Sequence, residues 1–280
     1  MSARLRGIAR ETETIVEAGH YRTPQGREVA IERALTAALS GTRLYGPEPV
    51  HVAALDTNRT PRIEVTGESS LQAAARMTGE GPGKVAVLNY ASARNPCGGY
   101  LNGAQAQEEA LCRGSALYAT LLRAPEFYAH HRAERSAFYT DRVIHSPGVP
   151  VFRDDRGRLL DTPYTAGFLT SPAPNAGVIR SRTPESARLI PAALASRAER
   201  VVEVAAVRGY RRLVLGAWGC GVFQNDPAEV AGAFRALLTG GGRFAGHFEQ
   251  IVFGIPDRDA AAPNRAAFDR AFADEAQLSG

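Results

Sequence analysis

Hydrophobic and polar positions follow two different periods along the chain, one typical of helices and one typical of strands. Near the N-terminus, apolar side chains recur every three or four residues from Leu5 to Val16, and Gly19 stands where it suits the end of a helix. Residues 84–90 form a short apolar run between Gly83 and a loop rich in proline and glycine, a pattern typical of a buried strand. The chain therefore contains both kinds of element.

The two patterns alternate over most of the sequence. Helices are predicted at 3–18, 32–39, 69–77, 104–122, 185–208, from about 227, and at 263–274. Strands are predicted at 28–31, 62–66, 84–90, 142–145, 149–153, 167–170, 213–217 and 250–255, with a hairpin turn at 155–157. This order favours an α/β fold with a parallel or mixed sheet and helices on both faces. We expect residues 1–280 to form one domain, with residues 1–45 as an N-terminal helical extension packed on it.

Length and composition exclude several classes of protein. The chain has 280 residues, of which 44% are hydrophobic and 22% charged, values typical of a globular rather than a disordered chain. The longest apolar runs, such as 201–207, are far shorter than the roughly 20 residues that cross a bilayer. The first ten residues also lack the apolar core of a secretion signal. We therefore expect a cytoplasmic protein with no membrane partner.

Charge and cysteine content add little chemistry of their own. The net charge of +4 is spread along the chain, which is a weak indication of a nucleic-acid partner. The three cysteines, Cys97, Cys112 and Cys220, are odd in number, and none belongs to a cluster with the spacing of metal ligands. We expect neither a disulfide framework nor a structural zinc site.

Two glycine-rich loops each follow a predicted strand and precede a predicted helix. They span residues 95–103 and 216–227. Ligands of α/β proteins bind at the carboxyl ends of strands, glycine lets the backbone approach them closely, and amides at a helix N-terminus favour phosphate. Two such loops predict a site for both halves of a nucleotide diphosphate, although tight turns alone would also explain the glycines. Neither loop has the P-loop or the G-x-G-x-x-G pattern, which weakens ATPase and dehydrogenase interpretations.

Two adjacent carboxylates follow the first loop. Glu108 and Glu109 fall in the first turn of the predicted helix, where carboxylates complement the helix dipole and helix capping is the simple interpretation. Adjacent helical side chains point about 100° apart, so these two cannot straddle one bond as the paired acids of ordinary glycosidases do. We expect one to act on a scissile bond and the other to hold a neighbouring hydroxyl.

The run NPCGGYLNGAQAQEEALCRGSALY resembles the signature of bacterial-type poly(ADP-ribose) glycohydrolases, a glycine triplet followed by Gln-Glu-Glu. The segments VTGESSLQAAARM, VPVFRDDRGRLL, TSPAPNAG and GAWGCGVFQNDP are similar to that family as well, and the similarity extends over about residues 1–275. The resemblance implies a macrodomain, a three-layer α/β/α sandwich with a mixed central sheet that binds ADP-ribose. It also implies hydrolysis of the ribose–ribose bonds of poly(ADP-ribose), with no metal or other cofactor.

The resemblance assigns roles to particular residues. Glu109 corresponds to the catalytic acid and Glu108 to the residue that binds the distal ribose, while the second loop covers the diphosphate. The expected substrate-binding residues are Asn89, Ser92, Asn95, Cys97, Gly98, Gly99, Gln107, Gly219, Cys220, Gly221, Val222 and Phe223. Glu68 is a candidate for contact with adenine. The spacing leaves open which of Asn89, Ser92 and Asn95 contacts ribose.

One position departs from the family pattern. Cys97 occupies the place of the first glycine of the triplet. If that place requires a positive φ, a side chain there costs about 1 kcal/mol or more and loosens the loop.

Two other functions share the same pocket. One is hydrolysis of mono-ADP-ribose linked to a macromolecule, and the other is a module that binds ADP-ribose without cleaving it. The acid at Glu109 favours an enzyme over a pure binder. The expected partners are poly(ADP-ribose) or ADP-ribosylated macromolecules as substrate and ADP-ribose as product, with the protein a monomer. The resemblance also implies a part in the response to DNA damage.

Overall fold

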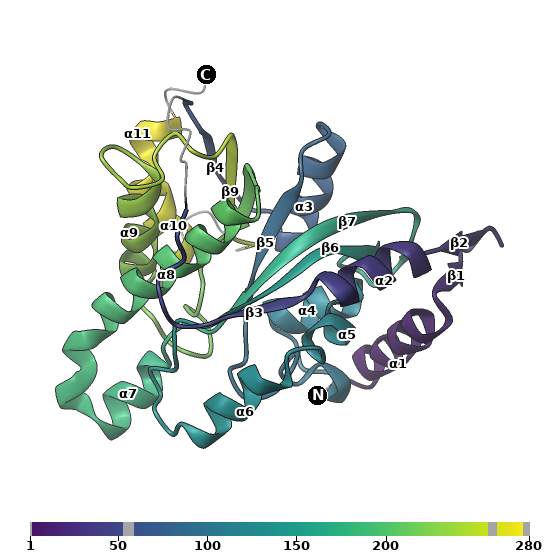
Figure 1. The fold of residues 1–280 in the computed structure, drawn as a ribbon, viewed down its shortest axis with the longest axis horizontal. Coiled ribbons are helices and arrows are strands. Elements are labelled where there is room, and N and C mark those ends of the chain that lie inside the picture. The colour runs from purple at the N-terminus through teal and green to yellow at the C-terminus, as the bar shows by residue number, and fades with distance from the viewer. Residues whose placement is uncertain (1, 53–58, 257–261, 277–280) are drawn as a thin grey trace.

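The computed structural model describes residues 2–52, 59–256 and 262–276 (Figure 1). The strands are β1 (His20–Arg22), β2 (Glu28–Ala30), β3 (Arg43–Tyr45), β4 (Arg62–Thr66), β5 (Val85–Tyr90), β6 (Val143–Arg153), β7 (Leu159–Ser171), β8 (Arg212–Leu215) and β9 (Gln250–Gly254). The helices are α1 (Ala3–Ala18), α2 (Glu32–Gly41), α3 (Ser70–Gly79), α4 (Gln107–Gly114), α5 (Leu117–Leu121), α6 (Pro125–Ala133), α7 (Ala176–Arg182), α8 (Ile190–Val207), α9 (Pro227–Leu238), α10 (Pro263–Ala271) and α11 (Ala273–Ala276). Two 3₁₀ helices, η1 (Tyr100–Asn102) and η2 (Pro184–Leu189), lie between them.

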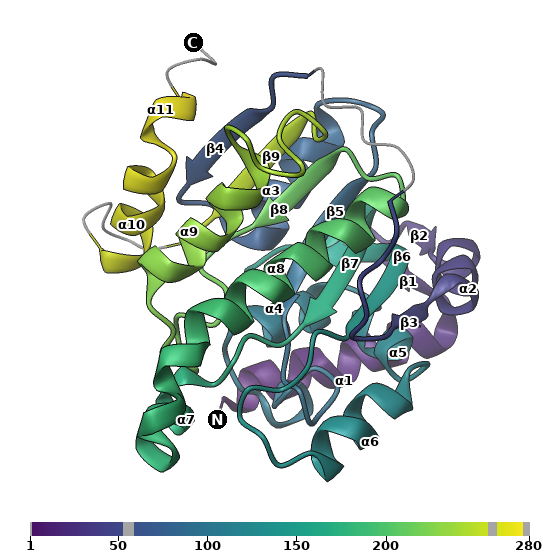
Figure 2. The same ribbon diagram turned by 60° about the vertical axis from the view of Figure 1, so that its left-hand side comes forward.

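A seven-stranded mixed sheet forms the centre of the fold, in the order β3-β6-β7-β5-β8-β9-β4. Neighbouring strands from β7 to β4 run parallel, whereas β6 pairs antiparallel with both β3 and β7. Helices cover both faces of this sheet, and α8, α9 and α10 lie together on one of them (Figure 2). The expected α/β/α architecture is confirmed.

Strand β5 shows why both faces are covered. Its side chains alternate between two hydrophobic clusters, because successive residues of a strand point to opposite faces. Val85 and Val87 pack with apolar residues of α1 to α6, and Ala86 and Leu88 pack with those of α7 to α10. All four side chains are buried, which explains the unbroken apolar run in the sequence.

The structure corrects the predicted helix over 104–122. The backbone is extended at Ser115, which separates α4 from α5 and pairs with Val151 of β6. A Cβ at Gly114 would lie 2.7 Å from a methyl carbon of Leu71, so the end of α4 packs closely on α3. Tertiary packing therefore overrides the helical pattern at this point.

Several further boundaries differ from prediction. The strands predicted at 142–145 and 149–153 form one strand, β6, which begins at Val143 and whose register shifts between Ser146 and Val149. The helix predicted from residue 185 begins at Ile190, after η2, and the sequence pattern missed β1, β3, α6 and α7. Within the three described ranges, no helix has the length and apolar character needed to cross a membrane.

Helix α1 packs against the segment that leads into α4. The Tyr100 hydroxyl lies 2.8 Å from a carboxylate oxygen of Glu13, to which it donates. The Thr12 hydroxyl donates to the carbonyl of Arg113 at 3.0 Å and accepts from Arg153 Nε at 3.1 Å. The N-terminal helix is therefore joined to α4 by buried polar contacts as well as by apolar ones.

The start of α3 gives a testable prediction for stability. Ser69 and Gln72 form a capping box, in which the Ser69 hydroxyl accepts from the backbone N–H of Gln72 at 3.1 Å. Ser69→Ala is expected to lower the free energy of unfolding by about 1 kcal/mol, because one helix N–H loses its acceptor. Urea unfolding should show this loss, and Ser69→Asn, which keeps a capping oxygen, should retain most of the stability. Equal losses in both variants would contradict the capping role.

Candidate active site

The two glycine-rich loops meet at the carboxyl end of the parallel strands. One joins β5 to α4 and the other joins β8 to α9. The second loop is fixed by the Asn225 side-chain amide, which donates to the carbonyls of Gly219 at 3.1 Å and Pro174 at 2.8 Å. Trp218 is buried under this loop and donates from its indole nitrogen to the carbonyl of Ser171 at 3.0 Å. Both loops are thus attached to the end of the sheet.

Helix α4 is held at its first residue by a side chain that bridges three elements. The Gln107 amide oxygen accepts from the backbone N–H of Tyr90 at 2.9 Å. Its amide nitrogen donates to the carbonyl of Leu88 at 2.8 Å and to the hydroxyl of Ser70 at 3.0 Å. Gln107 therefore fixes the start of α4 against β5 and α3, and these bonds occupy both polar atoms of a side chain that was predicted to bind substrate.

Glu108 is buried at the end of β5. Its two carboxyl oxygens accept from the Asn89 amide nitrogen at 3.2 Å and from the Ser92 backbone N–H at 2.7 Å. The pKa of Glu108 is raised to about 8, mainly by burial, with a smaller contribution from the charge of Glu109, while the hydrogen bonds from Ser92 and Asn89 lower it. Glu108 is therefore largely protonated at neutral pH.

Glu109 faces the glycine loop rather than the strand. Its Oε1 accepts from the backbone N–H of Gly99 at 3.0 Å. Arg113, one helical turn farther along α4, is buried and donates to the carbonyl of Ala104 at 2.7 Å. Burial lowers the pKa of Arg113, and the charge of Glu109 partly offsets that change. Glu109 thus lies between a backbone donor and a buried cation.

Both carboxyl groups converge on one glycine. A Cβ at Gly98 would lie 2.6 Å from Glu109 Oε1 and 3.1 Å from Glu108 Oε2, and the φ angle of Gly98 is +54°. Only glycine combines this backbone conformation with such close contact. The two glutamates therefore have different hydrogen-bond partners, as their spacing predicts, yet share one contact in the loop.

Cys97 also has a positive φ, +54°, and its side chain forms a disulfide with Cys112 of α4. The sequence analysis expected no disulfide framework and did not predict this single disulfide. Counting cysteines missed the bond because the two residues, 15 positions apart, are brought together by the fold, with Cα atoms 6.2 Å apart. The suspected need for a positive φ at this position is confirmed.

The three polar residues after β5 have separate roles. Asn89 is fully buried and donates to both Glu108 and the hydroxyl of Thr170. The Ser92 hydroxyl accepts from the backbone N–H groups of Arg94 and Asn95 and so stabilises the turn. Asn95 has an exposed side chain, and its carbonyl accepts from the N–H of Gly98 at 2.9 Å. Asn89 thus orients Glu108, and Asn95 has the side chain most open to a ligand.

The second loop presents a mixed surface. Gly219 has a φ of +73°, and a Cβ there would lie 2.4 Å from the Cβ of Ala173. Cys220 is half-buried, the backbone of Gly221 is exposed, and the Val222 side chain is 83% exposed. Phe223 packs against Tyr139, with ring centroids 5.9 Å apart. Gly219 therefore shapes the loop, while residues 220–223 form its accessible part.

Glu68, the candidate for contact with adenine, forms an ion pair with Arg76. Its two carboxylate oxygens accept from Arg76 at 2.9 and 2.8 Å. The Arg76 hydrogen bonds lower the pKa of Glu68. This pairing favours a structural role at the start of α3.

Sequence reasoning missed three residues that shape the site. Arg113 follows Glu109 by four positions, a helical spacing that could have identified the pair. Asn225 stands at the end of the second loop, and only the fold shows that it holds Gly219. Tyr139, with a φ of +57°, lies in a segment far from both loops in the sequence, and no motif or spacing indicated that it would pack against Phe223.

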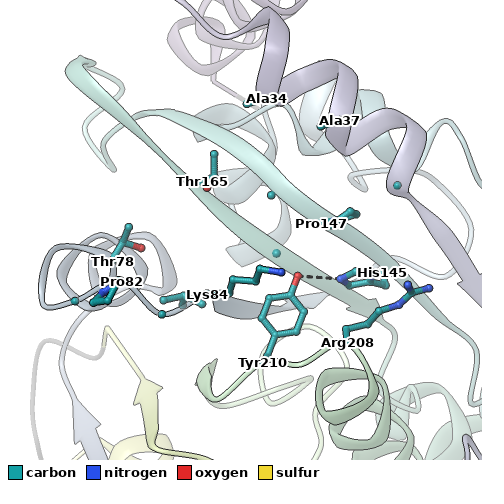
Figure 3. A pocket seen from close by; sticks show the side chains of 16 residues that line it. Ala34, Ala37, Thr78, Pro82, Lys84, His145, Pro147, Thr165, Arg208 and Tyr210 are labelled. Atoms are coloured by element: carbon teal, nitrogen blue, oxygen red, sulfur yellow. Dashed lines mark hydrogen bonds between the residues drawn. The ribbon is translucent and has the colours of Figure 1, made fainter.

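A separate cavity of about 730 Å³ lies at the opposite end of β5 (Figure 3). Lys84, His145, Arg208 and Tyr210 line it, and His145 Nε2 lies 2.9 Å from the Tyr210 hydroxyl. Its described lining contains no carboxylate, so it supplies no acid for the chemistry outlined above. Among the described residues there is also no group of three or more His, Cys, Asp or Glu side chains suited to a metal ion.

Comparisons with known proteins bear on the same residues. Residues 9–154 match the family described as "Microbial-type PARG, catalytic domain", where PARG denotes poly(ADP-ribose) glycohydrolase. This segment contains the first loop and both glutamates. No match was found among curated protein sequences.

Solved structures give matches over nearly the whole chain. The poly(ADP-ribose) glycohydrolase of Thermomonospora curvata, bound to the inhibitor ADP-HPD, is 52% identical, with a TM-score of 0.89 over 97% of this chain and 100% of that chain. The enzyme of Deinococcus radiodurans in complex with ADP-ribose is 44% identical, with a TM-score of 0.78 over 85% of this chain and 97% of that chain. The chain therefore belongs to the family of microbial-type poly(ADP-ribose) glycohydrolases.

Proposed function

We propose that this protein hydrolyses the ribose–ribose O-glycosidic bonds of poly(ADP-ribose) and releases ADP-ribose. The observation that carries the proposal is the position of Glu109, which is held by the Gly99 N–H at the edge of the first glycine loop. That arrangement occurs in a chain 52% identical to a glycohydrolase bound to ADP-HPD and 44% identical to one bound to ADP-ribose. The activity follows from the family, and the roles proposed for Glu108 and Glu109 are those that the resemblance implies.

Glu109 acts as the general acid and then as the general base. In its protonated form it donates to the leaving ribose oxygen while an oxocarbenium ion develops, and as a carboxylate it then activates water. Glu109 lies in the first turn of α4, and the Gly99 N–H holds its Oε1 at 3.0 Å beside the loop proposed to bind the diphosphate.

Glu108 holds the neighbouring ribose. Because it is largely protonated at neutral pH, it can donate a hydrogen bond to a ribose hydroxyl while Asn89 and Ser92 keep it in place. A neutral Glu108 also adds no negative charge beside the diphosphate.

The loops bind the rest of ADP-ribose. The diphosphate is bound between the backbone of Gly98 and Gly99 and the accessible residues of the second loop, 220–223. Within that second loop, Phe223 packs against the distal ribose. We propose that residues 1–280 act as one catalytic domain and that the protein is a monomer. A cytoplasmic location stays a prediction from the hydrophobic pattern of the sequence, and a part in the response to DNA damage stays a prediction from the resemblance.

The role of Glu109 can be tested with the isosteric substitution Glu109→Gln. We expect kcat for ADP-ribose release from poly(ADP-ribose) to fall by about 10²-fold to 10⁴-fold, with little change in the Kd of ADP-ribose measured by calorimetry. Glu126→Gln removes an exposed carboxylate from the first turn of α6 and is a matched control that should keep full activity. Parallel losses of binding and turnover in Glu109→Gln would show that the glutamate is structural.

The same assay separates the competing functions. Wild-type protein that bound ADP-ribose but released none from the polymer would contradict the proposal. Release from mono-ADP-ribosylated protein would then identify a mono-ADP-ribosyl hydrolase, and no release from either substrate would identify a binding module.

The protonation of Glu108 predicts a pH-dependent stability. Between pH 4.5 and about 8 the folded protein keeps a proton that the unfolded chain releases, so rising pH favours unfolding over this window. The contribution is greatest below pH 4.5 and lost above about 8. Glu108→Gln lacks this titration, so its stability relative to wild type should increase across the window in urea unfolding experiments. A constant difference between the two proteins would contradict the raised pKa.

Gly98 provides a steric test of the site. Gly98→Ala places a methyl group 2.6 Å from Glu109 Oε1 at a residue with φ +54°, so both turnover and stability should fall, stability by about 1 to 2 kcal/mol. Gly232→Ala on α9 meets no atom within 4 Å and should leave turnover unchanged. Normal kcat in Gly98→Ala would mean that the loop is not closely packed against the acid.

A further inference from the structure

The disulfide joins the two elements between which Glu109 lies. Cys97 is the residue directly before Gly98 and Gly99, and Cys112 is three residues after Glu109 on α4. Both cysteines are fully buried. The bond therefore links the glycine loop to the catalytic helix within one helical turn of the catalytic acid.

The loop needs such a link because its backbone is unfavourable at Cys97. Cys97 and Gly98 both have φ of +54°, and Cys97 lacks the freedom of glycine in this region. A left-handed conformation of a residue with a side chain is retained where its surroundings enforce it. Two interactions restrain Cys97. The covalent one is the disulfide to Cys112, and the noncovalent one is a hydrogen bond from the Tyr100 N–H to the Cys97 carbonyl at 3.0 Å.

A displacement of Cys97 moves the hydrogen-bond donor of Glu109. Gly99, which donates to Glu109 Oε1, is only two residues away, and a Cβ on Gly98 would lie within 3.1 Å of both carboxyl groups. If residue 97 relaxes to a negative φ, the backbone of 98 and 99 changes direction. Catalysis is sensitive to such changes, because a misplacement of about 1 Å costs about 10²-fold in rate.

We propose that Cys97 and Cys112 are positioning residues whose disulfide holds the glycine loop against Glu109, so that turnover depends on the redox state of this pair. The proposal rests on the role of Glu109 proposed above. With the bond formed, residue 97 stays left-handed and Gly99 donates to the acid. With the bond broken, residue 97 is released and the loop no longer orients the carboxyl group.

The chemistry of the switch balances with a dithiol reductant. One thiolate of the reductant attacks a protein sulfur, the S–S bond breaks, and a mixed disulfide forms. The second thiol of the reductant resolves it, so the two cysteines gain two electrons and two protons while the reductant becomes a disulfide. Because both sulfurs are buried, attack requires local opening of the loop, and we expect reduction to be slow in the folded protein.

The first experiment compares oxidised and reduced wild-type protein. Thiol titration in denaturant should find one thiol in the oxidised protein, from Cys220, and all three after treatment with a dithiol. We expect kcat for ADP-ribose release to fall by about tenfold to 10²-fold on reduction and to recover on reoxidation. Circular dichroism and thermal melting of both samples establish that the reduced protein remains folded.

A matched pair of variants separates positioning from general stability. The alanine pair is the double variant Cys97→Ala with Cys112→Ala, and the glycine pair is Cys97→Gly with Cys112→Ala. Both double variants lack the disulfide, and they differ by one methyl group at residue 97. The alanine pair should be as slow as reduced wild type, and the glycine pair should recover most of the lost kcat, because glycine adopts φ +54° without a restraint. Neither pair should respond to the dithiol.

Three outcomes would overturn the proposal. They are an unchanged kcat in folded, fully reduced wild type, full activity in the alanine pair, and equal losses in the alanine and glycine pairs. Failure of the proposed function is distinguishable, because in that case oxidised wild type would itself release no ADP-ribose from the polymer.

Discussion

The close approach of a glycine backbone to two adjacent carboxyl groups is the constraint on which the site depends. Gly98 has room for no side chain, since Glu109 and Glu108 oxygens lie at 2.6 and 3.1 Å from the position of a Cβ. To bring α4 that close, Gln107 binds the end of β5 and α3, and Asn89 and Ser92 fix Glu108. The sheet thus serves to place one helical turn against one loop.

Burial separates the chemistry of the two glutamates. Glu108 has lost water on the strand side, and its pKa is raised to about 8, while Glu109 faces a backbone donor and the buried Arg113. Adjacent residues of one type therefore have different surroundings and can take different roles. Burial also gives these carboxyl groups a surrounding of low dielectric, in which a displaced hydrogen-bond donor costs more free energy than in water. This cost explains why the disulfide and the hydrogen bond to the Cys97 carbonyl restrain the loop.

Local sequence patterns predicted the parts of the fold that local physics determines. The N-terminal helix ends at Gly19 in a left-handed conformation, β4 has the expected bounds, and α3 lies where a helix was predicted. The helix over 104–122 was wrong because Ser115 pairs with β6, a contact that no periodicity contains. For the site, the loop and the glutamate pair could be predicted from spacing, and Arg113 could have been found from its helical spacing to Glu109. The role of Asn225 and the disulfide depend on segments that only tertiary structure brings together.

The packing of α1 has a consequence for the order in which the chain can fold. Thr12 binds the carbonyl of Arg113, 101 positions later, and the side chain of Arg153, 141 positions later. During synthesis from the N-terminus, the helix is made long before these partners leave the ribosome. Helix α1 can contact β1 and α2 soon after they are made, but its polar contacts with Arg113 and Arg153 form only once β6 has been completed. Contacts of such high sequence separation are expected to slow folding.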